Sequence, residues 1–102
     1  MRSRTIFLLS CLPFLATSAA LASSAPAKVG LCASCHGDAG RSPYATFPNL
    51  AGQNAGYIAY TIGQYQHHQR LGPQADTMSG IAVQLTPADI KALAAYYASL
   101  KP

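Results

Sequence analysis

The pattern of apolar and polar positions predicts short helices separated by long polar stretches. Residues 26–35 form the first candidate, with Lys28 on its outer face. Residues 57–70 form the second, because their apolar side chains recur at roughly helical spacing. These side chains are Tyr57, Ile58, Ile62 and Tyr65. Gly63 weakens this second pattern, and Leu71-Gly-Pro73 is expected to end the helix.

The strongest helical pattern lies in the last part of the chain. Thr86 is a favourable N-cap, Pro87 suits the first helical position, and the Asp89 carboxylate lies near the positive end of the helix dipole. The residues that follow mark one apolar face at helical spacing, namely Ile90, Leu93, Ala94, Tyr97 and Leu100. The sequence therefore predicts a final amphipathic helix that begins after Thr86.

Two polar stretches between these helices are predicted to be loops. Residues 37–56 contain four glycines and two prolines, and residues 71–80 are also polar. No segment shows the strict alternation of a half-buried strand, so the predicted fold class is all-α, with three to four short helices. Loops of this length are unusual around a small core, which indicates that another component organises them.

The start of the chain has the features of a secretory signal peptide. Two arginines precede an apolar stretch at residues 6–15, and mainly small residues follow at 17–25. We expect residues 1–22 to be removed and residues 23–102 to form one domain. The apolar stretch is about half as long as a membrane span, so no stable span is expected. A retained anchor, and lipid attachment at Cys11, are the alternatives.

The size and charge of the chain limit the classes of function that it can have. Removal of the signal peptide leaves about 80 residues, a size at which domains commonly need a disulfide, a metal or a cofactor. It also removes two arginines, so that the formal net charge falls from +4 to +2. The remaining cations are scattered and have no interleaved aromatic residues, so nucleic-acid binding is not expected.

The segment Cys32-Ala-Ser-Cys35-His36 has the C-x-x-C-H pattern of c-type haem attachment. Two thiols one helical turn apart match the two vinyl groups on one edge of the porphyrin. His36 then points under the ring and supplies the proximal nitrogen to the iron. The predicted cofactor is therefore one haem c, bound covalently through Cys32 and Cys35.

Three other interpretations of the two cysteines stay open. A thioredoxin-like motif needs a βαβ surround, which the pattern lacks. A zinc site needs two more ligands, and the neighbouring His67 and His68 would diverge on a helix. A structural disulfide between Cys32 and Cys35 is the third interpretation, because exported proteins commonly contain disulfides.

A second iron ligand is expected from the polar stretch at 71–80. Met78 lies 42 residues beyond His36 in this stretch. Its polar neighbours make it a poor core residue, and a loop of this length could bring its thioether to the opposite haem face. His67 or His68 as the ligand, and an open site, are the alternatives.

Several stretches, taken in order, resemble the class I c-type cytochromes. They are Cys32-Ala-Ser-Cys-His-Gly37, Phe47-Pro-Asn-Leu-Ala-Gly-Gln53, Met78-Ser-Gly80, Leu85-Thr-Pro-Ala-Asp-Ile90 and Ala94-Ala-Tyr-Tyr-Ala-Ser99. The likeness is greatest to the small bacterial cytochromes of the c-four and c-five group, and it covers residues 27–100. It implies the cytochrome c fold, in which short helices and long loops wrap around one haem. Ala25 replaces a glycine that packs helices together in relatives, so a looser contact between the first and last helices is expected.

The resemblance also implies roles for individual residues. His36 and Met78 would be the axial ligands of the iron. The carbonyl of Pro48 would accept a hydrogen bond from the other nitrogen of His36 and so orient its ring. Three further residues would line the haem edge and propionates: Gln53, Tyr57 and Arg70. Ordinary core or surface packing is the alternative for these three.

The expected function is periplasmic electron transfer, without catalysis, by a haem that cycles between its ferric and ferrous states. Expected partners are redox proteins, either a terminal oxidase or reductase, or a periplasmic dehydrogenase of which this chain is an electron-accepting subunit. A haem enzyme or gas sensor with an open distal site is the third hypothesis. The weak net charge favours docking through apolar and shape contacts.

Overall fold

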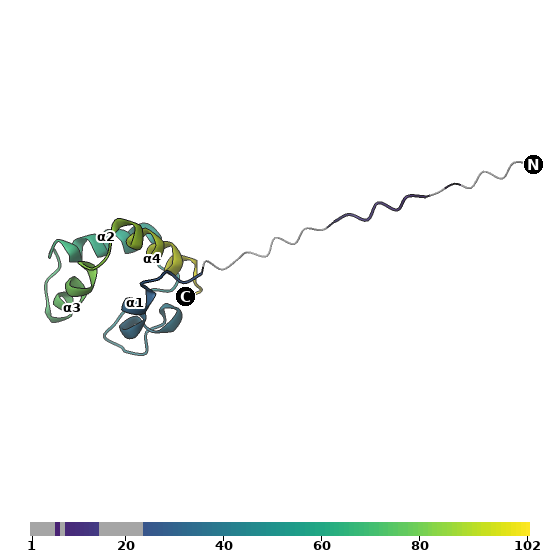
Figure 1. The fold of residues 1–102 in the computed structure, drawn as a ribbon. Helices are drawn as coiled ribbons and strands as arrows, with labels where there is room; N and C mark the ends of the chain where they lie inside the picture. Colours follow the sequence, from purple (N-terminus) through teal and green to yellow (C-terminus); the bar gives the residue numbers. More distant parts are fainter. Residues whose placement is uncertain (1–5, 7, 15–23) are drawn as a thin grey trace, which may run out of the picture.

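The computed structural model describes residues 6, 8–14 and 24–102, and within them the chain is all-helical. The elements, in chain order, are α1 (Val29–His36), the short 3-10 helix η1 (Asp38–Gly40), α2 (Ala55–Gln66), α3 (Pro73–Ala82) and α4 (Pro87–Ser99). Figure 1 shows α1 and η1 on one side, and α2 with α4 on the other. The all-α prediction with three to four short helices is confirmed.

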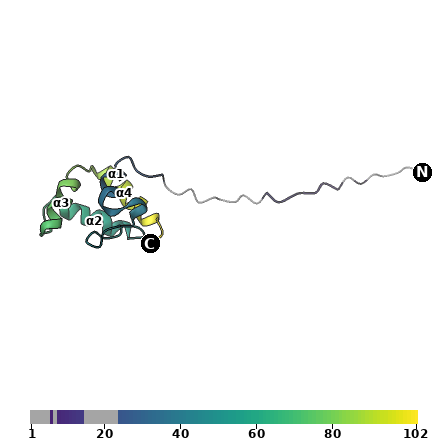
Figure 2. The ribbon, with the colours of Figure 1, turned by 90° about the horizontal axis from the view of Figure 1, so that it is seen from below.

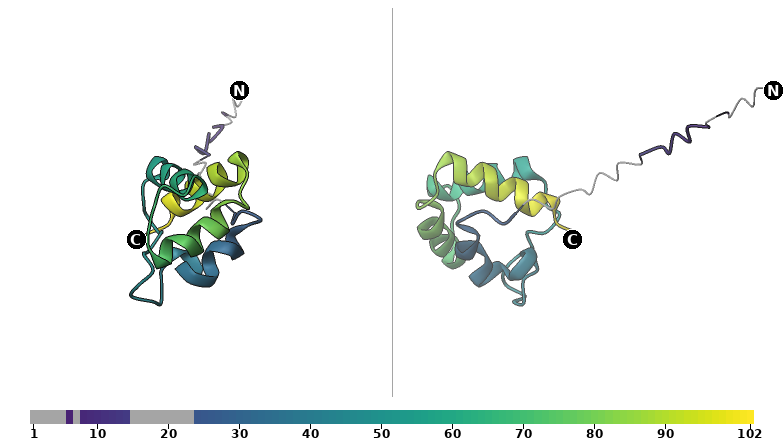
Figure 3. Two further views of the ribbon diagram at one scale, coloured as in Figure 1. Left: turned by 90° about the vertical axis from the view of Figure 1, so that its left-hand side faces the viewer. Right: turned by 45° about the vertical axis from the view of Figure 1, so that its right-hand side comes forward.

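The core is formed where α2 packs against both α3 and α4. Its buried residues are Ile58, Ile62, Ala82, Leu85, Leu93, Ala94 and Tyr97. Three of them, from Leu93 to Tyr97, lie on the face of α4 that its spacing predicted. Residues Val29 and Leu31 of α1 are partly buried against this cluster. Figures 2 and 3 show the helices from below and from two sides.

The prediction of a loop at residues 71–80 is wrong, because α3 lies there. Pro73 occupies its first turn and Asp76 lies near its positive end, both favourable for a helix start. The buried face of α3 consists of Ala75, Ser79 and Ala82, at helical spacing. These side chains are small and one is polar, so they gave no hydrophobic periodicity.

The helix predicted at residues 57–70 ends earlier than expected, because α2 stops at Gln66. His68 has a φ of 52°, a left-handed conformation that a continuing helix does not allow. Both His67 and His68 are exposed and lie in the turn after α2. The placement of the histidine pair on a helix is therefore wrong. No group of three metal-binding side chains occurs among the described residues, which gives the zinc interpretation no support.

The start of α4 has the cap that the sequence predicts, and Lys28 reinforces it. The Thr86 hydroxyl accepts a hydrogen bond from the Asp89 amide (3.1 Å), while the Asp89 carboxylate accepts one from the Thr86 amide (2.9 Å). The Lys28 ammonium donates to the same carboxylate over 2.6 Å. These contacts, first of all that of Lys28, lower the pKa of Asp89 to about 2. Lys28 thus joins the segment before α1 to α4, a contact that the sequence did not indicate.

The predicted signal peptide, residues 1–22, lies largely outside the described part of the chain. Residues 6 and 8–14 of it are described, and they form no helix. Among the described residues, no helix has the length and apolar character needed to span a membrane.

Candidate cofactor site

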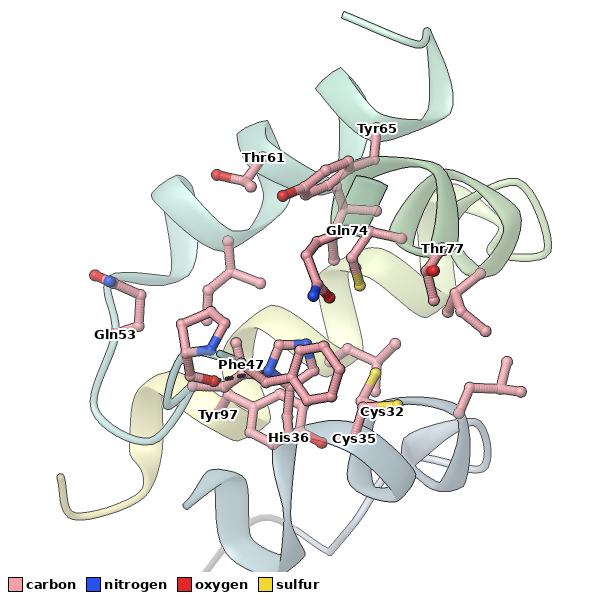
Figure 4. A pocket seen from close by; sticks show the side chains of 18 of the residues that line it. Cys32, Cys35, His36, Phe47, Gln53, Thr61, Tyr65, Gln74, Thr77 and Tyr97 are labelled. Carbon is pink, nitrogen blue, oxygen red and sulfur yellow. Dashed lines mark hydrogen bonds between the residues drawn. The ribbon is translucent and has the colours of Figure 1, made fainter. Parts of the chain in front are cut away.

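A cavity of about 360 Å³ lies between α1, the segment after it, α2 and α3. This volume lies in the usual range of sites for small molecules and cofactors, about 300–1,000 Å³. All eight residues predicted for the site line it: Cys32, Cys35, His36, Pro48, Gln53, Tyr57, Arg70 and Met78. Figure 4 shows side chains from several helices converging on this space.

The two cysteines and the histidine come from a single helix. Cys32 and Cys35 lie one turn apart on α1, and both have free thiols. His36 is the last residue of α1 and is 7% exposed. Burial raises the pKa of the Cys32 thiol, so this thiol is neutral at neutral pH. The pattern C-x-x-C-H thus places two thiols and one imidazole on the same cavity wall.

A hydrogen bond fixes the orientation of the His36 ring. Its Nδ1 atom lies 2.7 Å from the carbonyl oxygen of Pro48, as the dashed line in Figure 4 marks. A carbonyl can only accept, so Nδ1 must carry the hydrogen in this contact. The lone pair is then on Nε2, which is left free to bind a metal. This is the contact that the family resemblance implied for Pro48.

The backbone around His36 holds the Pro48 carbonyl in place. The carbonyl of Gly40 accepts hydrogen bonds from the amides of Leu50 (2.8 Å) and Ala51 (3.1 Å). The side chain of Asn49 accepts one from the Ser42 amide over 2.7 Å. These contacts tie residues 49–51, directly after Pro48, to the segment that follows α1.

Glycine is required directly after His36. Gly37 has a φ of 80°, and a Cβ atom there would lie 1.9 Å from the carbonyl oxygen of Arg41. Any side chain would therefore force the chain to leave α1 along a different path. The sharp exit from α1 is what allows the following segment to return under the imidazole.

The opposite wall of the cavity belongs to α3. Met78 is half-buried there and lines the cavity, together with Gln74, Thr77 and Ile81. Figure 4 shows Gln74 and Thr77 reaching in from α3, across the cavity from His36. The predicted distal ligand is thus on a helix, and that helix presents it to the cavity.

A polar edge is built around Arg70. Its guanidinium donates hydrogen bonds to Gln64 (3.1 Å), Tyr65 (3.4 Å) and Tyr57 (3.5 Å). It also lies 5.2 Å from the centre of the Tyr65 ring. The hydrogen bond from Arg70 lowers the pKa of the Tyr57 hydroxyl. Gln53, which lines the same cavity, accepts a hydrogen bond from the Asn54 amide over 2.9 Å.

Sequence reasoning missed several residues that line the cavity. Thr61 and Tyr65 follow Tyr57 at intervals of four residues on α2, a signal that could have found them once Tyr57 was a candidate. Tyr97 was assigned to the apolar face of the last helix, with no sign that it also reaches the cavity. The hydroxyl groups of Thr61 and Tyr97 are buried, and neither forms a hydrogen bond with another of the described residues.

The side chains in this cavity fit an iron porphyrin. The imidazole has a free nitrogen, a thioether lies on the opposite wall, and the two thiols match the spacing of covalent attachment. The hydroxyl groups of Thr61 and Tyr97 add polar groups to the cavity wall that have no hydrogen-bond partner in the described part of the chain. His67 and His68 do not line this cavity.

Comparisons with known proteins agree with this geometry. A family model described as Cytochrome c matches residues 27–101. The chain is 42% identical over 72 residues to cytochrome c-554(548) of Halomonas halodenitrificans, covering 71% of this chain and 87% of that protein. It is 36% identical over 87 residues to cytochrome c4 of Pseudomonas aeruginosa, covering 85% of this chain and 42% of that protein.

A third relative has a functional name. The chain is 38% identical over 80 residues to a thiosulfate dehydrogenase electron acceptor of Thiomonas intermedia, covering 78% of this chain and 36% of that protein. The chain thus spans less than half of the Pseudomonas and Thiomonas proteins, but most of the Halomonas protein.

Proposed function

The chain belongs to the cytochrome c family, and from this premise we propose that it is a periplasmic carrier of single electrons with one haem c. Electron transfer is the function that the family membership supports, and a covalently bound c-type haem is the cofactor of the family. The finer assignments that follow concern the attachment residues, the axial ligands, the compartment and the partners.

The observation that carries the proposal is the hydrogen bond between His36 and Pro48. It leaves Nε2 of a buried imidazole as a free metal ligand beside two thiols at the spacing of haem attachment. We assign Cys32 and Cys35 to the covalent bonds, and His36 and Met78 to the two axial positions. The haem iron, when bound, accepts and releases one electron.

The residues around the cavity favour electron transfer over catalysis. If His36 and Met78 both bind the iron, they would leave no iron position open to a substrate. Ile58, Ile62 and Leu93 give the cavity apolar walls that exclude water. Arg70, Tyr57 and Gln53 supply the polar edge where the propionates would lie.

The compartment and the domain boundaries follow from the first residues. We assign residues 1–22 to a signal peptide for export and residues 23–102 to one mono-haem domain. The order of arginines, apolar residues and small residues supports this assignment, which places the protein in the periplasm.

The partners of the carrier are redox proteins, and two candidates remain. The first is a terminal oxidase or reductase, to which the chain would shuttle electrons. The second is a periplasmic dehydrogenase of which the chain is an electron-accepting subunit. The likeness to two thiosulfate dehydrogenase electron acceptors favours this second candidate. Co-purification with a larger dehydrogenase subunit would distinguish a fixed subunit from a free shuttle.

The absorption spectrum of the oxidised protein tests the ligand assignment. The protein would be purified from a host with c-type haem maturation, as wild type, Met78→Ala, His67→Ala and His68→Ala. We expect a weak far-red band of thioether-ligated ferric haem, which Met78→Ala abolishes and both histidine variants retain. Loss of the band in a histidine variant alone would contradict the assignment. Carbon monoxide binding to the native reduced protein at neutral pH would indicate an open, catalytic or sensing site instead.

A further inference from the structure

Tyr97 lies in the core, and its side chain also lines the cavity. The residue is 1% exposed, and its hydroxyl oxygen forms no hydrogen bond with any other described residue. Leaving a buried hydroxyl unpaired is unfavourable, and most such groups in folded proteins do have a partner. A phenylalanine would fill the same apolar space without this penalty. The hydroxyl is therefore a buried donor that lacks a well-formed acceptor among the described residues.

The ring of Tyr97 is closely surrounded by other parts of the chain. A Cβ atom added to Gly40 would lie 2.8 Å from the Tyr97 ring, so the backbone of η1 packs directly on it. Tyr96 stacks edge-on with its centroid at 5.1 Å, and the carbonyl of Tyr97 accepts a hydrogen bond from the Gly52 amide over 2.9 Å. These contacts hold the ring of Tyr97 against η1 and its backbone against Gly52.

Cys32 is the polar group that faces Tyr97 in the cavity. Both residues line the cavity, and Figure 4 shows them on the same side of it, the tyrosine from α4 and the cysteine from α1. Burial, and then the negative charge of a Cys32 thiolate, raise the pKa of Tyr97. The phenol therefore keeps its proton at neutral pH and can donate a hydrogen bond. The raised pKa of Cys32 keeps its sulfur neutral in the free chain.

Haem attachment changes the hydrogen bonding of this sulfur. The thiol adds across a vinyl group: a carbon–sulfur bond forms, the hydrogen of the thiol moves to the other vinyl carbon, and no electrons are gained or lost overall. The sulfur then has no hydrogen of its own and can only accept. A donor held beside it consequently gains a defined acceptor.

We propose that Tyr97 is a positioning residue for the haem attachment, whose hydroxyl donates a hydrogen bond to the Cys32 sulfur in the mature protein. The inference rests on the proposed function, since it requires haem to be bound through Cys32. It explains why α4, which contributes neither a thiol nor an axial ligand, presents a tyrosine to the cavity at this point.

The substitution Tyr97→Phe tests the proposal by the sign of its effect. If the Tyr97 hydroxyl has no partner, the phenylalanine variant should be as stable as the wild type or more stable. If the hydroxyl is bonded to sulfur, the variant should be less stable than the wild type. We expect the melting temperature of the haem-containing protein to fall by about 4–8 °C, the shift that loss of one hydrogen bond produces in a domain of this size. Tyr96→Phe, the matched control on the same helix, should leave it nearly unchanged.

The cysteine variants then identify the partner. The fall caused by Tyr97→Phe should persist in Cys35→Ala, where attachment is through Cys32 alone, and vanish in Cys32→Ala, which leaves no acceptor at this position. An unchanged or higher melting temperature for Tyr97→Phe, or an equal fall in both cysteine backgrounds, would overturn the proposal.

An independent measurement serves if the single-cysteine proteins do not accumulate. In the reduced protein, the Tyr97 hydroxyl proton should exchange slowly and show a nuclear Overhauser effect to the Cys32 β-protons. Absence of that contact overturns the proposal. Mass spectrometry of the wild-type protein separates this failure from failure of the proposed function, since only the latter leaves the chain without covalent haem.

Discussion

The proximal wall of the cavity, residues 32–50, and the distal wall, residues 73–82, hold their candidate ligands by different means. The proximal His36 is buried, and its ring is hydrogen-bonded to the Pro48 carbonyl over 2.7 Å. The segment that presents this carbonyl is itself tied down by backbone and side-chain hydrogen bonds. The distal Met78 is half-buried on α3, whose inner face consists of small residues packed on α2.

This difference indicates that local hydrogen bonds position the ligand on the proximal wall. On the distal wall, the packing of α3 against α2 positions it. A histidine ligand needs one ring nitrogen protonated and the ring held in one orientation, so it needs a partner. A thioether has no proton to place and three rotatable bonds, so it needs only a helix that brings it near. The two walls should therefore respond differently to equivalent substitutions.

The largest expected contrast is between the two ligands. His36→Ala should lower the yield of protein with covalent haem at least about tenfold, because it removes the ligand that the proximal wall is built around. Met78→Ala should retain the covalent haem, and its reduction potential should fall by on the order of 0.2 V. Haem content per protein and potentiometric titration measure these effects. Equal loss of haem in both variants would mean that the walls contribute equally to attachment.

The next contrast compares two glycines. Gly37→Ala should lower the free energy of unfolding by about 3 kcal/mol or more, because the added Cβ would meet the Arg41 carbonyl at 1.9 Å. Gly80→Ala on α3 should raise it by about 0.5–1 kcal/mol, since nothing lies within 4 Å of the added Cβ and alanine favours the helix. Denaturant unfolding of the haem-containing variants gives both values. A mild effect of Gly37→Ala would show that the exit from α1 can shift.

A smaller contrast concerns the polar side chains of the two walls. Asn49→Ala removes the acceptor of the Ser42 amide and should lower the free energy of unfolding by about 0.5–1.5 kcal/mol. Thr77→Ala should change it by less than about 0.5 kcal/mol, because the Thr77 side chain is exposed and forms no hydrogen bond within the described residues. A shift of the reduction potential in Asn49→Ala, but not in Thr77→Ala, would show that the Pro48 carbonyl has moved.

The smallest expected effect lies outside both walls, at the ion pair that joins the segment before α1 to α4. The pKa of Asp89 is lowered to about 2 in the folded protein, from an ordinary value of 3.8. The stabilisation by this carboxylate is therefore present above about pH 4 and is lost as the pH falls toward 2. Asp89→Asn should melt at a slightly lower temperature than wild type at neutral pH, and the difference should close between pH 4 and pH 2.

The control for this pH effect is Asp38→Asn. Asp38 is exposed and forms no ion pair within the described part of the chain. Its substitution should therefore leave the change in melting temperature between pH 4 and pH 2 as it is in the wild type. A pH-independent difference for Asp89→Asn would assign its effect to the helix cap alone.

The success of sequence reasoning differed between the helices. The final helix was predicted with its cap and its buried face, because Thr86, Asp89 and the apolar spacing are all local signals. The helix α3 was missed, because Ala75, Ser79 and Ala82 are buried by close approach to α2 and not by their hydrophobicity. The end of α2 was placed too late, because the left-handed conformation of His68 ends the helix before the predicted end at Leu71-Gly-Pro73.

The sequence alone determined which atoms can carry the chemistry on the proximal side. Cys32, Cys35 and His36 lie within five residues, so a single turn of helix places the two thiols and the imidazole on one wall whatever the rest of the chain does. The N-cap of α4 was determined in the same way, because its two hydrogen-bonding partners are three residues apart.

Only the tertiary structure decided what meets these atoms from elsewhere in the chain. The Pro48 carbonyl lies 12 residues from His36, and Lys28 lies 61 residues from Asp89. The presence of Met78 and Tyr97 in the cavity depends likewise on how α3 and α4 pack. Contacts between residues far apart in the chain form only when many buried side chains pack together at once, and no local pattern of residues specifies that arrangement.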